Sequence, residues 1–164
     1  HEEDMSDRME LEIARYLEQV SDDHLSDETK HKIRQMMREI GELESIGDAC
    51  YHLARTLSRL EQTGKTFAAQ QVADLQAMMA LCDQALRQMC ITMHGHRDEH
   101  DIRDTFHIEN QINAMRDRLK RANITAVNEH QYDYTLGTIF GDLISSLERL
   151  GDYVVNVVEA RFGK

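Results

Sequence analysis

The sequence predicts an all-α fold, an elongated antiparallel bundle in which five helices follow one another. Of the 164 residues, 5% are aromatic, nine are methionine and none is proline or tryptophan. Strands are enriched in aromatic and β-branched residues, which are sparse here. Apolar residues instead recur at helical spacings of three and four, and the segments between the expected helices are short.

The first helix extends to about Val20 and carries an apolar stripe made by Met5, Met9, Ile13, Tyr16, Leu17 and Val20. Ser26 is placed to cap the second helix, and Gly64 is placed to end that region. The expected second to fifth helices cover, in order, about residues 27–60, 66–95, 98–121 and, after the loop NITAVN, 129–162.

The chain is acidic, with a formal net charge of −11 from 30 acidic and 19 basic residues. This charge repels nucleic-acid phosphates and anionic membrane surfaces and favours cations, so we expect no nucleic-acid partner. No charge-free apolar run reaches the roughly 18–20 residues that span a bilayer. The chain begins with His rather than Met, and an upstream membrane portion is compatible with this.

Three cysteines, Cys50, Cys82 and Cys90, form no CxxC motif and do not pair up evenly. Free cysteine is among the most buried residue types, so we expect three buried, reduced thiols. Reduced thiols are typical of a cytosolic environment.

An internal repeat is the most informative feature of the sequence. The segments ELESIGDACYH (42–52) and SLERLGDYVVN (146–156) align at an offset of 104, which superimposes Glu44 on Glu148, Gly47 on Gly151 and Asp48 on Asp152. The first helix aligns with the fourth at an offset of 106, which superimposes Glu3 on Glu109, Asp7 on Asn113 and Met9 on Met115. The first copy covers residues 1–62 with two helices, and the second covers 66–162 with three.

The repeated acids predict two metal sites. Residues four apart lie one above the other on a helix, so Glu44 with Asp48, and Glu148 with Asp152, are vertical pairs of carboxylates. A glycine beside each pair lets the neighbouring helix approach closely. Clustered carboxylates in a bundle either shift their pKa or bind a cation, and an all-oxygen site suits Mg²⁺, Ca²⁺, Mn²⁺ or iron.

Two simpler interpretations stay open at this point. Paired acids on a helix often belong to a solvated face that binds nothing. His52 and Asn156 continue the two acidic faces by one turn, and each is either a peripheral ligand or an ordinary polar residue.

The segments ESIGD and ERLGD resemble the Glu-x-x-x-Asp signature of the PhoU domain, an all-helical module in bacterial phosphate-transport control. EEDMSDRMELEIARYL and DLISSLERLGDYVVNVVEA extend the resemblance to the C-terminal PhoU-like domain of bacterial sodium/phosphate cotransporters. The resemblance covers essentially the whole chain.

The resemblance implies a bundle of two repeated three-helix units that bind multinuclear metal clusters through the repeated acids, with iron, Mn, Mg, Ca or Zn as the ion. The implied ligands, carried over by position, are Glu44, Asp48, Glu148 and Asp152, with Glu3, Asp7 and Glu109 facing them and Asn113 in place of the second Asp. Asn113 removes one charge, so we expect a weaker or differently occupied second site.

The resemblance also implies that the first unit lacks its first helix, which would lie upstream of His1. The apolar groove left on the first copy would then be open to a second copy of the chain, so we expect a homodimer.

The leading functional hypothesis is a non-enzymatic, metal-binding regulatory domain of a sodium-dependent phosphate transporter. It would lie on the cytoplasmic side of the bacterial inner membrane, with the upstream membrane part of its own chain as partner and inorganic phosphate bound through metal. The alternative is a free-standing PhoU-type regulator that docks on a transporter or a sensor protein.

Two further motifs carry weaker signals. HGHRDEH (94–100) has three His in seven positions and would suit zinc, but no Cys accompanies them. Glu28 and His31 form one Glu-x-x-His, the element of di-iron oxidases, but a second such element is missing. A di-iron carboxylate oxidase is therefore the second alternative.

Overall fold

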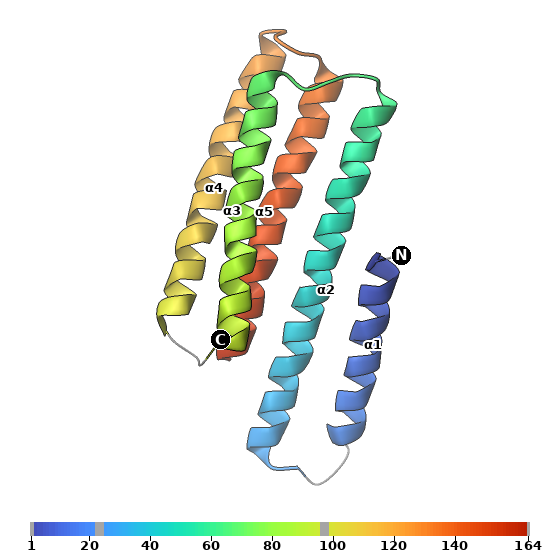
Figure 1. Ribbon diagram of the computed structural model, residues 1–164, viewed down its shortest axis with the longest axis vertical. Helices are drawn as coiled ribbons and strands as arrows, with labels where there is room; N and C mark the ends of the chain where they lie inside the picture. Colours follow the sequence, from blue (N-terminus) through green and yellow to red (C-terminus); the bar gives the residue numbers. More distant parts are fainter. Residues whose placement is uncertain (1, 22–24, 96–98, 164) are drawn as a thin grey trace.

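The computed structural model describes residues 2–21, 25–95 and 99–163, and every regular element in these ranges is an α-helix. This confirms the predicted all-α fold (Figure 1). The helices are α1 (Glu2–Ser21), α2 (Asp27–Gln62), α3 (Ala69–His94), α4 (Glu99–Asn128) and α5 (Tyr134–Phe162). Over the described residues, none of them combines the length and the apolar character needed to cross a membrane.

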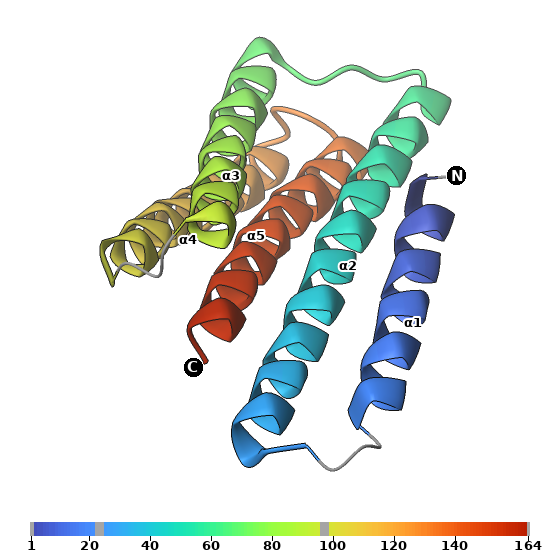
Figure 2. The same cartoon turned by 60° about the horizontal axis from the view of Figure 1, so that its bottom comes forward.

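Helix α5 is the centre of the bundle. It packs against α2, α3 and α4, and Figure 2 shows it between them. Its buried side chains cover about half of its circumference, since Ile144 and Val157 are both fully enclosed and project about 140° apart around the helix. A helix with so wide an apolar face requires more than one neighbour. Helix α1, in contrast, packs only against α2 within the described ranges.

The ends of α2 lie where the sequence predicted them. Ser26 Oγ accepts a hydrogen bond from the Thr29 N–H at 3.2 Å, which satisfies one of the free amides of the first turn. At the other end, Thr63 caps the helix and Gly64 has a φ of 66°, a backbone conformation that favours glycine.

The predicted loop NITAVN (123–128) is wrong, because α4 continues through it to Asn128. Buried Asn123 belongs to the helix and joins it to α5: its Nδ2 donates to Gly137 O at 2.8 Å. The reversal lies later, where His130 has a φ of 58°. The fifth helix starts at Tyr134 rather than near residue 129, with Asp133 accepting from the Leu136 N–H.

The cysteines only partly follow the prediction. Cys82 is buried, its thiol lies 3.3 Å from Leu147 O, and burial raises its pKa to about 12. Cys50 and Cys90 are exposed, so the expectation of three buried thiols is wrong for these two. Cys90 is eight residues after Cys82, which rotates it by about 80° around α3, away from the core.

The apolar stripe of α1 is mostly exposed, because the helix has one neighbour. Leu17 is buried as predicted, whereas Met5, Met9, Ile13 and Tyr16 are exposed, Tyr16 by 64%. Exposed apolar side chains gathered along one helix are typical of an interaction surface. This stripe is where we place the predicted contact between two copies of the chain.

We expect the protein to have about twice its 19.0 kDa chain mass in solution, as measured by light scattering after gel filtration. Met9→Lys combined with Tyr16→Glu should return it to a single chain, because charges on the stripe oppose its burial. Tyr134→Glu, at a tyrosine that is 78% exposed on α5, is the matched control and should leave the mass unchanged. A wild-type mass of one chain would contradict the predicted dimer.

Candidate metal centre

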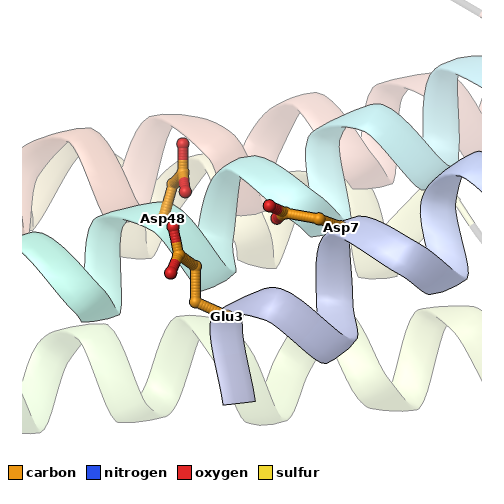
Figure 3. A group of neighbouring side chains, drawn as sticks. All are labelled: Glu3, Asp7 and Asp48. Atoms are coloured by element: carbon orange, nitrogen blue, oxygen red, sulfur yellow. The ribbon is translucent and has the colours of Figure 1, made fainter. Parts of the chain in front are cut away.

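Three carboxylates from α1 and α2 meet at the middle of the α2 helix. Glu3, Asp7 and Asp48 each offer one oxygen atom, and these atoms lie within 4.8 Å of one another. Figure 3 shows Glu3 and Asp7 one turn apart on α1, with Asp48 of α2 beside them. All three residues are half-buried. The structure therefore brings together three of the four acids predicted for the first copy, and Glu44 lies outside this group.

Gly47 lies beside this convergence, at the position of α2 that faces Ser6 of α1. A Cβ built on Gly47 would lie 3.3 Å from Ser6 Oγ, and Ser6 stands between Glu3 and Asp7 on α1. In the second copy, a Cβ on Gly151 would lie 3.0 Å from Ile112 Cδ1 of α4. Ser6 and Ile112 are themselves 106 residues apart, so both glycines face the equivalent position of the neighbouring helix.

Two further carboxylates border the first cluster. Burial raises the pKa of Glu44, and the nearby charges of Asp48, Glu10 and Asp7 raise it further. Glu10 was missed by the sequence analysis; its Oε1 lies 3.7 Å from the Cβ position of Gly41 on α2. The signal was available, because Glu10 follows Asp7 by three residues and so shares its face of the helix.

The first cluster, defined as Glu3, Asp7, Glu10, Glu44 and Asp48, fits a cation. Across the described ranges, no Lys, Arg or His forms an ion pair with any of these five carboxylates. Uncompensated carboxylates in a partly buried setting repel one another. Oxygen atoms this close can contact one ion at the roughly 2.0–2.6 Å distances of Mg²⁺ and Ca²⁺. Glu3, Asp7 and Asp48 are the residues that would hold such an ion.

The second cluster, defined as Glu109, Asn113, Arg116, Glu148 and Asp152, is arranged differently. Glu148 forms an ion pair with Arg116 of α4, and Asn113 Nδ2 donates to Glu109. Burial raises the pKa of Asp152, as do the charges of Glu148 and Glu109, while Arg116 opposes the shift. Asn113 Oδ1 is buried with no hydrogen-bond partner in the described chain. The four predicted ligands are neighbours, but a cation of the chain is already among them.

The two peripheral candidates have different surroundings. His52 is exposed, and with Asp48, Ser146 and Arg149 it lines a small pocket of about 80 Å³ between α2 and α5. Asn156 lies at the same helix interface, where its Nδ2 donates to Glu42 Oε2 at 2.9 Å. His52 thus borders the first cluster, whereas the Asn156 amide joins α5 to α2.

The remaining motifs gain no support. Residues 96–98 of HGHRDEH lie outside the described ranges, and His94 Nδ1 is 2.8 Å from Cys90 O within its own helix. Glu28 is exposed at the start of α2 and pairs with Lys32 at 2.8 Å, so its carboxylate is neutralised in solvent. Neither arrangement resembles a buried ligand set.

The two glycines should respond differently to alanine. Gly151→Ala places a methyl group against Ile112, which is 1% exposed and cannot yield, so we expect a loss of about 1 kcal/mol in the free energy of unfolding. Gly47→Ala meets only the Ser6 hydroxyl, and the better helix propensity of alanine should make it neutral or stabilising by about 0.5 kcal/mol. Urea unfolding in chelator measures both, and equal effects would contradict the packing described.

The raised pKa of Glu44 predicts a pH dependence of the metal-free protein. A carboxyl whose pKa is higher in the folded state stabilises the fold while protonated, and this contribution is lost as pH rises from about 4.5 through the folded pKa. In chelator, the melting temperature of the wild type should therefore fall, relative to that of Glu44→Gln, as the pH rises above about 4.5. Parallel pH curves for the two proteins would show that Glu44 does not titrate in this way.

Comparison with known proteins agrees with the resemblance seen in the sequence. An uncharacterized protein of Deinococcus radiodurans is 27% identical over 125 residues, which cover 76% of this chain and 44% of the relative. The chain thus spans less than half of the length of that relative. No solved structure matches the chain significantly. The profile of the PhoU domain matches residues 75–160, which include all of α4 and most of α3 and α5. The chain belongs to the PhoU domain family.

Proposed function

We propose that this protein is a metal-binding regulatory domain in the control of phosphate transport, and that its ion is held between α1 and α2. The observation that carries the metal proposal is the first cluster: five half-buried carboxylates with no basic partner in the described chain. When bound, the ion supplies positive charge that turns the mutual repulsion of these groups into attraction through a shared ligand.

Metal binding would act on the position of α1. This helix contacts only α2, and Leu17 is its one buried apolar side chain in the described part. Its interface therefore gains little from apolar burial, while Glu3, Asp7 and Glu10 face the acids of α2. Without an ion, repulsion opposes the docking of α1, and with an ion the same groups favour it. The ion-bound and ion-free proteins then differ in how firmly α1 is held.

The regulatory part of the proposal rests on the family. PhoU domains are regulatory and non-enzymatic, act in phosphate transport and interact with transport or sensor proteins. The finer proposal is that this chain is the cytoplasmic domain of a sodium-dependent phosphate transporter, on the inner face of the bacterial inner membrane. In the Deinococcus relative, the matching region is likewise part of a longer protein.

Inorganic phosphate would reach this domain only through metal. The chain has a net charge of −11, and the first cluster adds no basic group that could receive an anion. A bound divalent ion changes the local sign of the field and leaves coordination positions that phosphate oxygens can fill. Phosphate binding should therefore require prior binding of the metal.

The alternative within the same family is a free-standing regulator that docks on a transporter or a sensor protein. A hydrophobic region encoded upstream in the gene would select the transporter domain, and a short soluble gene product would select the free-standing regulator. The di-iron oxidase has less support, because Glu28 is exposed and paired with Lys32.

Calorimetric titration of the tag-free protein with Mn²⁺ tests the metal site. We expect Asp48→Asn to weaken binding at least tenfold, because it removes one of the three converging oxygen ligands. Asp104→Asn, an equal change of charge at an exposed position of α4, should bind Mn²⁺ like the wild type. Amide hydrogen exchange should slow in α1 when Mn²⁺ is added, and much less in α5.

Equal Mn²⁺ affinities for Asp48→Asn and Asp104→Asn would show that the first cluster is not the binding site. If Mn²⁺ binds with measurable heat but amide exchange in α1 does not change, the metal site is supported. The proposed effect of the ion on the docking of α1 is then contradicted.

A further inference from the structure

We infer that the second cluster is held together by a cation of the chain itself, the Arg116 guanidinium, and takes no metal ion. The domain then has one metal site instead of the two that its repeat would predict. The statement that the first cluster binds the metal ion rests on the function proposed above. The role of Arg116 rests only on the contacts within the second cluster.

Arg116 lies at the centre of the second cluster. Its guanidinium pairs with Glu148 of α5 through one terminal nitrogen and with Asp117 through Nε at 3.0 Å. The Arg116 and Glu148 side chains are only 24% and 17% exposed, so this pair is partly shielded from solvent. A guanidinium stays charged at every physiological pH and presents several donors in a fixed plane. It therefore provides the positive charge that the surrounding carboxylates need.

The repeat shows that the guanidinium takes the place of an acid. At the offset of 106, Arg116 of the second copy corresponds to Glu10 of the first, and Glu10 borders Glu44 as Arg116 borders Glu148. Asn113 corresponds in the same way to Asp7. The first cluster has five carboxylates and a formal charge of −5, while the second has three carboxylates and one guanidinium, a charge of −2.

The ligand atoms of the second cluster are also occupied. Glu148 is engaged by Arg116, and Glu109 accepts the amide of Asn113. Asp152 and the Asn113 Oδ1 remain, which is one protein ligand fewer than the three mutually close carboxylates of the first cluster. A divalent ion would also have to approach a permanent positive charge. Within the described residues, three mutually close acid ligands are found at the first cluster and not here.

The helices around the second cluster do not need an ion to pack. Ile112 of α4 is 1% exposed against Gly151, Leu119 is buried on the same helix, and Asn123 bonds to Gly137 of α5. Apolar burial and these contacts hold α4 on α5, in contrast to the single buried apolar residue of α1. One ion pair is sufficient to neutralise the acids at this interface.

The test introduces into the second cluster the acidic residues that stand at the equivalent positions of the first cluster. Asn113→Asp combined with Arg116→Glu recreates the first set of charges, and we expect it to retain more Mn²⁺ per chain than the wild type after gel filtration. Asn113→Asp combined with Arg121→Glu is the control, with the same charge change at an exposed arginine of α4; it should retain as much as the wild type. In the wild type, Asp152→Asn should leave the Mn²⁺ content unchanged.

Equal Mn²⁺ contents for the two double variants, or a loss of Mn²⁺ on Asp152→Asn in the wild type, would overturn the inference. If the wild type retains no Mn²⁺, the proposed function is contradicted. Even then, Mn²⁺ retained by the Asn113→Asp, Arg116→Glu variant would support the role of Arg116. If the Asn113→Asp, Arg116→Glu variant does not fold, the single variants are compared by thermal melting in chelator. Arg116→Gln should then lower the melting temperature by several degrees more than Arg121→Gln does. Equal shifts would then overturn the inference.

Discussion

The domain depends on one constraint, which is that acidic side chains are brought together where two helices approach closely. Gly151 leaves room for buried Ile112 of α4, Gly47 faces the equivalent Ser6 of α1, and the acids beside the two glycines share a half-buried space. Burial and mutual repulsion disfavour the ionised form of these carboxylates, so they either take up protons or are balanced by positive charge. The source of that positive charge is therefore the property in which the two halves of the repeat differ.

In the α4–α5 half, the charge comes from Arg116 and is part of the covalent chain. The interface is consequently complete as soon as the chain folds, and its buried residues continue into the core around α5. In the α1–α2 half, the five carboxylates have no basic partner among the described residues, and under the proposed function a metal ion supplies the balancing charge. The two helix pairs of the repeat therefore differ in whether the chain itself provides a cation.

Much of this arrangement could be predicted from the sequence, because the repeat fixes which residues are equivalent. The offsets of 104 and 106 identified the glycines and acids, and the close approach at Gly47 and Gly151 has the predicted register. The same alignment pairs Glu10 with Arg116, but only the structure showed that these side chains face the clusters. The predicted α4–α5 loop is misplaced, because nothing local in NITAVN shows that the Asn123 side chain donates to Gly137 O across the helix interface. Cys90 was misjudged because a run of Met and Leu on α3 does not reveal which side lacks a neighbour.

Helix α2 is longer than the bundle that supports it. Its 36 residues extend over about 54 Å, compared with about 44 Å for the 29 residues of α5, and its first turns project beyond the end of α5 (Figure 1). These turns of α2 lie away from α5, so a partner bound to them would contact α2 beside α1 without touching the carboxylates.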